Sequence, residues 1–166
     1  IGQAVATASR YSEIEFHDQG GLGEVFLAYD EQLGRKVAVK FIHEEFQDDE
    51  DLLRRFHIEA EVTGRLDHPG VVPVYGVGEG WDGRPFYVMR FLEGDTLDTA
   101  IAEFHSRDFS REKHSARRMV LHRLLRHLVS ACQTVAYAHN RGVLHRDIKP
   151  ANLVLGKYGE TLVLDW

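Results

Sequence analysis

The polar segment Val143–Asn152 constrains the fold of this chain more than any other stretch. It reads Val-Leu-His-Arg-Asp-Ile-Lys-Pro-Ala-Asn, and the apolar run Leu153–Leu155 follows it directly. Apolar residues on both sides of a charged stretch predict a strand, a loop and a second strand. The loop would then carry four functional side chains, namely those of Arg146, Asp147, Lys149 and Asn152. A polar surface turn between two strands is the alternative interpretation.

Composition and charge exclude several classes of function. The chain has 166 residues and a net charge of −6, so we expect no nucleic-acid partner. Its one cysteine, Cys132, cannot form a disulfide within the chain, which predicts a reducing, cytoplasmic location. No apolar run approaches the ~20 residues of a membrane span, so we expect no membrane segment within this fragment. Because the chain lacks an initiator Met and stops inside a strand-like run, we expect both ends to be cut.

The first strands surround a glycine-rich turn. Residues 1–10 have no clear period and predict a flexible arm. From Tyr11 the pattern predicts a strand, a turn containing Gly20, Gly21 and Gly23, and a second strand containing Val25. Glycines allow backbone N–H groups to approach phosphate oxygens closely. An ordinary hairpin turn is the alternative.

A lysine and a glutamate predict a buried ion pair. In the next strand, residues 36–40, alternation places Ala38 and Lys40 on one face. Asp48–Leu66 is predicted to be a helix, with Glu59 in the middle of an apolar stripe that contains Leu52, Phe56, Thr63 and Leu66. Because an unpaired buried carboxylate costs several kcal/mol, Glu59 needs a cation, and Lys40 is the candidate. A solvated Glu59 and a surface Lys40 are the alternatives.

Further strands and helices follow. Val71–Val77 and Pro85–Phe91 are predicted strands around a turn at 78–84, with Trp81 as an exposed turn residue. Asp95–Ala102 is predicted to begin a helix, and Glu103–Lys113 a surface loop. Met119–Asn140 is predicted to be an amphipathic helix. Its buried stripe is predicted to contain Leu121, Leu124, Leu125, Leu128, Cys132 and either Val135 or Ala136. Basic residues crowd its first half and predict a solvated face more than a docking surface: Arg117, Arg118, His122, Arg123, Arg126 and His127.

The last residues predict a metal-binding hairpin. Two apolar strands, Leu153–Leu155 and Leu162–Leu164, flank a glycine-containing turn. If Leu155 pairs with Leu162, Asn152 lies opposite Asp165 at the open end. An amide oxygen and a carboxylate are hard oxygen ligands that suit Mg²⁺ together with substrate phosphates.

These segments together resemble the eukaryotic-type serine/threonine protein kinases, in the style of bacterial members. The loop matches the catalytic motif H-R-D-x-K-x-x-N, and Gly20, Gly23 and Val25 match the nucleotide motif G-x-G-x-x-G-x-V, although Asp18 replaces its first glycine. Lys149-Pro150 resembles the Ser/Thr-specific branch, and Asp165-Trp166 begins the D-F-G motif. The resemblance implies an α+β, protein-kinase-like fold truncated at the D-F-G position. It has an antiparallel-sheet N-lobe with one main helix (11–89), a hinge (90–94), and a partial helical C-lobe (95–166).

The resemblance also implies roles for individual residues. Asp147 would accept the proton of the substrate hydroxyl, Lys149 would neutralise the γ-phosphate, and Glu59 would align Lys40 on the α- and β-phosphates. The nucleotide-binding residues would be Gly20, Gly21, Gly23, Val25, Ala38, Lys40, Met89, Arg90, Leu92 and Val154, and the metal ligands Asn152 and Asp165. ATP and Mg²⁺ are the implied cofactors, and a protein with a Ser or Thr acceptor is the implied substrate. The oligomeric state is left open.

Three other functions stay open at this point. A nucleotide-binding pseudokinase module, a small-molecule phosphotransferase of related fold and a purely structural interaction domain would each share part of the pattern. We expect the fragment alone to be inactive or weakly active, since the activation segment and most of the C-lobe are missing from it. We also expect its long helix to expose an apolar stripe that the absent helices would cover.

Overall fold

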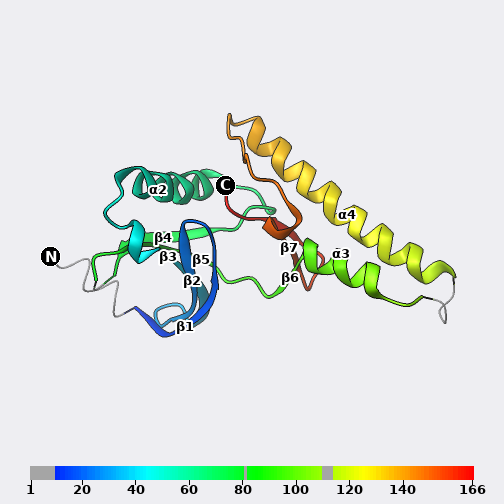
Figure 1. Ribbon diagram of the computed structural model, residues 1–166, viewed down its shortest axis with the longest axis horizontal. Coiled ribbons are helices and arrows are strands. Elements are labelled where there is room, and N and C mark those ends of the chain that lie inside the picture. Colours follow the sequence, from blue (N-terminus) through cyan, green and yellow to red (C-terminus); the bar gives the residue numbers. More distant parts are fainter. Residues whose placement is uncertain (1–9, 81, 110–113) are drawn as a thin grey trace. The chain divides into compact units, whose positions relative to one another are not determined.

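The strands before and after the glycine-rich turn form a five-stranded antiparallel sheet. The computed structural model describes residues 10–80, 82–109 and 114–166 (Figure 1). The sheet has the order β1-β2-β3-β5-β4. Its strands are β1 (Tyr11–Gln19), β2 (Gly23–Asp30), β3 (Arg35–Ile42), β4 (Val74–Glu79) and β5 (Pro85–Arg90), with the 3₁₀ turn η1 (Glu44–Phe46) and helix α2 (Glu50–Arg65) between β3 and β4.

The rest of the chain is mainly helical and carries a small second sheet. Its helices are α3 (Leu97–Ser106) and α4 (His114–His139), followed by the 3₁₀ turn η2 (Pro150–Asn152). The strands β6 (Gly94–Thr96), β7 (Leu153–Gly156) and β8 (Thr161–Val163) form a sheet in the order β6-β7-β8. Contacts divide the chain into two units. The first runs to Arg65 and includes Pro73–Phe91, and the second consists of Leu66–Val72 and Leu92–Trp166. The predicted lobe boundaries remain a proposal.

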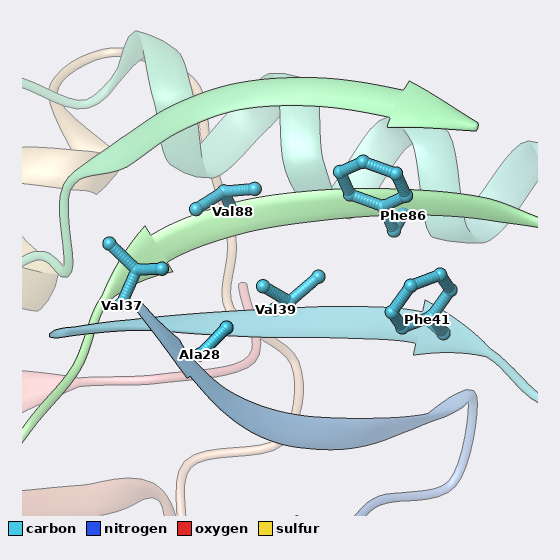
Figure 2. Close-up of a cluster of buried hydrophobic side chains, with 6 residues drawn as sticks. All are labelled: Ala28, Val37, Val39, Phe41, Phe86 and Val88. Atoms are coloured by element: carbon cyan, nitrogen blue, oxygen red, sulfur yellow. The ribbon is translucent and has the colours of Figure 1, made fainter. Parts of the chain in front are cut away.

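The large sheet has a buried cluster on each face. Figure 2 shows six side chains from three adjacent strands on one face, those of Ala28, Val37, Val39, Phe41, Phe86 and Val88. The other face carries Ile42 and Tyr87, which pack with Phe56 and Ala60 of α2. The strand alternation predicted for residues 36–40 is therefore confirmed.

Helix α2 lies slightly inside its predicted bounds of Asp48–Leu66. The side chain of Asp49 accepts hydrogen bonds from the N–H groups of Asp51 and Leu52, so Asp49 is the N-cap rather than a helical residue. Phe56, Glu59 and Thr63 are buried, which confirms the predicted stripe. Leu66 is buried too, beyond the end of the helix.

The strand predicted for Val71–Val77 is wrong in its first half. Strand β4 begins only at Val74, because Pro73 has no N–H to donate. Val71 instead forms an isolated bridge with Val163, and the N–H of Val163 donates to the carbonyl of Gly70 at 2.8 Å. Residues 66–72 accordingly cluster with the second unit, although the expected N-lobe range of 11–89 includes them.

Three predictions in the second unit are also corrected. Asp95 and Thr96 belong to strand β6, and helix α3 begins after Thr96, whose side chain caps it by accepting from the N–H of Thr99 at 3.2 Å. The helix continues to Ser106, so the first residues of the loop predicted at Glu103–Lys113 are helical. Val143 and Leu144 form no strand, because the chain there is held by turn hydrogen bonds such as Val143 N–H to Ala138 O.

Helix α4 buries a different face from the predicted one. Of the predicted stripe only Leu124 is buried, while Leu121, Leu125, Leu128 and Cys132 are exposed. The buried face follows a 3-4 spacing instead and consists of Leu124, His127, Ala131, Thr134 and Ala138. Small residues allow close approach on this face, and a Cβ on Gly70 would lie 2.0 Å from the hydroxyl of Thr134. The expectation that the long helix exposes an apolar stripe is confirmed by the exposed leucines.

The ends of the described ranges limit three predictions. Residues 1–9 of the predicted arm, Trp81, and residues 110–113 of the predicted loop lie outside the described residues. Arg10, which was assigned to the flexible arm, is fixed: its guanidinium donates to both carboxylate oxygens of Asp30, at 2.9 and 2.7 Å. Because Arg10 satisfies that carboxylate, the pKa of buried Asp30 is lowered. Within the described ranges, no helix has the length and apolar character needed to cross a membrane.

Buried His127 should make stability depend on pH. It was predicted on the solvated face of α4, but its Nδ1 lies 2.8 Å from the hydroxyl of Thr161, and burial, together with nearby Arg123, lowers its pKa. The unfolded chain therefore binds a proton more readily, and the free energy of unfolding should fall as pH falls below about 6.5. Chemical denaturation at pH 7.5 and 5.5 should show a smaller fall for His127→Asn than for the wild type. The exposed neighbour variant His122→Asn should behave as the wild type, and equal falls in all three proteins would contradict the prediction.

Candidate functional site

The glycine-rich turn is closed by backbone hydrogen bonds. The N–H of Gly20 donates to the carbonyl of Gly23 at 2.8 Å, and the ring of His43 lies 2.8 Å from the carbonyl of Gly20. Gly23 is required by packing, since a Cβ there would lie 2.1 Å from the carbonyl oxygen of Phe41 in β3. Gly21 has open space around it. Asp18 is exposed, and its carboxylate accepts from the N–H of Gln19 at 2.8 Å.

The sheet register brings several predicted nucleotide-binding residues together. Val25 pairs with Lys40 across β2 and β3, and Ala38 pairs with Met89 across β3 and β5. Directly paired residues share a face of the sheet, so these four side chains lie opposite the cluster in Figure 2. A small residue, two apolar residues and a cation on one surface suit a flat base and its phosphates.

A buried carboxylate with two donors lies on this face. The ammonium of Lys40 donates to Oε1 of Glu59 at 2.6 Å, and the hydroxyl of Tyr87 donates to the same oxygen at 2.6 Å. The predicted Lys40–Glu59 ion pair is confirmed. Sequence reasoning missed Tyr87, because its place beside Lys40 depends on the β3–β5 register, which alternation alone does not give.

Three further residues predicted to contact the nucleotide, two of them in the hinge, differ in their surroundings. The N–H of Arg90, at the end of β5, donates to the carbonyl of Pro73 at 3.0 Å. Leu92 is half-buried between β5 and β6. Val154 lies in β7, is 7% exposed, and pairs with Thr96 and Leu162. Their contacts with a nucleotide remain predictions.

The buried side chain of His145 stabilises the loop after α4 through hydrogen bonds. Nε2 of His145 lies 2.6 Å from the carbonyl oxygen of Leu164, and its Nδ1 accepts from the N–H of Asp147 at 3.3 Å. Between these residues Arg146 has a φ of 65°, a strained value for a residue with a side chain. His145 thus links the loop to the end of strand β8. Sequence reasoning missed this role of His145, although His145 is the first residue of the matched motif and could have been singled out on that ground.

Three of the predicted functional side chains meet in this loop. The ammonium of Lys149 donates to Oδ2 of Asp147 at 2.7 Å, and Nδ2 of Asn152 donates to the carbonyl oxygen of Asp147 at 3.0 Å. Asp147 and Lys149 are exposed, whereas Asn152 is buried. The hydrogen bond from Lys149 lowers the pKa of Asp147, and the same bond raises the pKa of Lys149.

The register predicted for the last hairpin is wrong by one residue. Leu155 pairs with Thr161, not with Leu162, because the turn is closed by the N–H of Gly156 and the carbonyl of Glu160. Asn152 consequently lies opposite Leu164, whose N–H donates to its carbonyl at 2.9 Å. Asp165 follows one residue later with a φ of 56°.

The ligand chemistry of this hairpin still fits Mg²⁺. Asn152 offers an amide oxygen and lies opposite Leu164, and the exposed carboxylate of Asp165 comes directly after Leu164. Among the described residues, no group of three or more His, Cys, Asp or Glu side chains could hold a metal by itself. Mg²⁺ commonly uses one or two protein oxygens together with waters and substrate phosphates, so two ligands suffice for that ion.

Comparison with known proteins identifies relatives of nearly the whole chain. The model of the protein kinase domain matches residues 11–166. The serine/threonine-protein kinase PknD of Protochlamydia amoebophila is 41% identical over 156 residues, and that of Chlamydia caviae 42% identical over 158 residues. The matches cover 94% and 95% of this chain but 16% and 17% of those proteins, so the chain spans about a sixth of their length.

A solved structure agrees in fold. The crystal structure of the Mycobacterium tuberculosis PknI kinase domain matches with a TM-score of 0.70 and 27% sequence identity. The match covers 95% of this chain and 58% of that chain.

Replacing Gly23 should damage the turn, whereas replacing Gly21 should not. Gly23→Ala forces a Cβ into the backbone of Phe41 and should lower the free energy of unfolding by about 1–3 kcal/mol. Gly21→Ala is the matched control, because nothing lies within 4 Å of its Cβ. Urea denaturation of the three proteins measures the difference. Equal stability of the two variants would show that β2 and β3 do not approach this closely.

The acidity of Asp147 should depend on Lys149. In Lys149→Met the carboxylate loses its strongest partner, so the pKa of Asp147 should rise toward the ordinary value of about 3.9. A titration of the Asp147 carboxyl carbon by NMR measures this change. Lys157→Met is the control, since Lys157 pairs with Glu93 instead and should leave that pKa unchanged. A pKa that is the same in all three proteins would rule out the Lys149 bond as its cause.

Proposed function

We propose a function for this chain on the basis of its family. The chain belongs to the protein kinase family and has the protein-kinase fold. We propose that it takes part in ATP-dependent phosphoryl transfer to Ser or Thr hydroxyls of proteins. The observation that carries the proposal is the loop in which Lys149 and Asn152 both bind Asp147. A proton acceptor beside a cation is what transfer of a phosphoryl group to a hydroxyl requires.

The residues of the first unit have a binding role in this proposal. Lys40 binds the α- and β-phosphates, and Glu59 holds its ammonium in place. The face shared by Val25, Ala38 and Met89 receives the base, and the turn with Gly20, Gly21 and Gly23 covers the phosphates. The backbone of Arg90 in this unit is a further proposed nucleotide contact, as are the backbone of Leu92 and the side chain of Val154 in the second unit.

The residues of the second unit have the chemical role. Asp147 orients the substrate hydroxyl and accepts its proton at a carboxylate oxygen. An aspartate of ordinary pKa is already ionised at neutral pH, and the hydrogen bond from Lys149 lowers the pKa of Asp147 further. Lys149 neutralises charge on the γ-phosphate. The family generally uses ATP with Mg²⁺, and Asn152 and Asp165 are the residues that would hold the metal, which supplies charge neutralisation to phosphate oxygens.

The relatives favour this function over the alternatives. Both relatives described above are named serine/threonine-protein kinases, and no observation favours a pseudokinase or a small-molecule phosphotransferase. A protein substrate is therefore our proposal for the acceptor. We also propose a cytoplasmic location, because the free thiol of Cys132 is suited to a reducing compartment.

Nucleotide binding by the natural full-length protein should depend on Lys40 and Asp165. Ligand at 100 times its dissociation constant stabilises by about 2.7 kcal/mol, so ATP with Mg²⁺ should raise the melting temperature visibly. Lys40→Met and Asp165→Asn should each weaken that shift. Lys157→Met changes an exposed ion pair elsewhere and should keep the shift.

Phosphoryl transfer should depend on Asp147 in the same preparation. Asp147→Asn should retain the ATP-dependent thermal shift while losing most transfer of ³²P to a Ser/Thr protein substrate. Binding without transfer in the wild type would indicate a pseudokinase. Absence of both would refute the proposal.

A further inference from the structure

We propose that Tyr87 is a positioning residue that holds Glu59 in the orientation that pairs with Lys40. The inference rests on the proposed function and deepens it, since it concerns how the phosphate-binding lysine is kept in place. Tyr87 is not among the residues that the sequence predicted to be functional. Three arguments support the inference: the hydrogen bonds of Tyr87, its packing, and the competition between phosphates and Glu59 for the ammonium of Lys40.

Tyr87 and Lys40 donate hydrogen bonds to the same carboxylate oxygen. Both donate to Oε1 of Glu59, each at 2.6 Å, and all three residues are buried, with exposures of 4% for Lys40, 8% for Glu59 and 4% for Tyr87. A buried carboxylate needs every donor it can obtain, because water cannot replace a missing one. Glu59 therefore has one charged and one neutral donor, from two different strands.

Packing fixes the phenol that makes this hydrogen bond. Tyr87 is directly paired with Lys40 across β3 and β5, so the two side chains leave the sheet on the same face. The ring of Tyr87 lies 5.3 Å from that of Phe56, which is one turn from Glu59 in α2, and Ile42 and Ala60 complete the cluster. Helix α2 thus contacts Tyr87 both through an apolar ring and through a carboxylate.

A bound nucleotide gives this arrangement its purpose. Phosphate oxygens compete with Glu59 for the ammonium of Lys40, and any movement of Lys40 toward them weakens its bond to Oε1. The hydroxyl of Tyr87 carries no charge and is not attracted to phosphate in the same way. It keeps Oε1 hydrogen-bonded while the ammonium of Lys40 is shared between the Glu59 carboxylate and the phosphates. Glu59 and α2 therefore stay in position.

Removal of one hydroxyl tests the proposal. Tyr87→Phe keeps the ring and its contact with Phe56 but removes the donor to Glu59. In the natural full-length protein it should raise the KM for ATP about tenfold, as expected for loss of a hydrogen bond to a charged group. Tyr75→Phe makes the same chemical change in β4, where the ring stacks under Arg35, and should leave the KM unchanged.

A double-mutant cycle separates positioning from general support of the fold. If Tyr87 acts through the Lys40–Glu59 pair, Tyr87→Phe should alter nucleotide affinity less than twofold when Lys40 is already replaced by Met. A purely structural hydroxyl would have the same effect in both backgrounds, and such additivity would overturn the proposal. An unchanged KM in Tyr87→Phe would overturn it too.

A third measurement needs no nucleotide. Amide hydrogen exchange along α2 should be faster in Tyr87→Phe than in the wild type and unchanged in Tyr75→Phe, because only the former loosens Glu59. Unchanged exchange in Tyr87→Phe would overturn the inference even in a protein that fails to bind ATP. Failure of the wild type to bind ATP, with faster exchange in Tyr87→Phe, would instead refute the proposed function alone.

Discussion

The first unit depends on one buried carboxylate that must be satisfied. Glu59 lies in the apolar stripe of α2, and leaving it unpaired would cost several kcal/mol. Lys40 from β3 and Tyr87 from β5 supply the donors, so the carboxylate fixes how α2 is rotated against those two strands. The same constraint presents Lys40 on the face that carries Val25, Ala38 and Met89. Packing and the proposed nucleotide binding therefore have a common cause here.

The second unit differs, because the two charged side chains of its candidate site are exposed. Asp147 and Lys149 face solvent, yet the loop that carries them has a fixed shape. Buried polar side chains beneath it provide that shape: His145 bonds the carbonyl of Leu164, and Asn152 bonds that of Asp147. An exposed charge can be moved at little cost, whereas a buried hydrogen bond is expensive to break. The loop thus combines exposed charged side chains with a backbone held by hydrogen bonds from buried side chains.

The sequence predicted those features in which one arrangement was much cheaper than any other. A charge within an apolar stripe demanded a partner, so Lys40–Glu59 could be foreseen. Predictions went wrong where two arrangements looked equally good. Both registers of β7 and β8 pair apolar residues, and the turn at Gly156–Glu160 selects the observed one. Helix α4 has two apolar faces, and the one with small residues, Ala131 and Thr134, is buried while larger leucines remain exposed.

The electrostatics of Asp147 indicate which kind of catalysis the loop is suited to. The pKa of Asp147 is lowered by the hydrogen bond from Lys149, and a less basic carboxylate suits orienting a hydroxyl more than removing its proton early in the proposed reaction. Phosphoryl transfer asks for little proton abstraction before the transition state and depends chiefly on orientation and charge. Lys149 holds Asp147 at low pKa only while its ammonium stays there. In the proposed transfer, movement of Lys149 toward phosphate oxygens would leave Asp147 more basic, and so a better acceptor for the proton of the attacking hydroxyl.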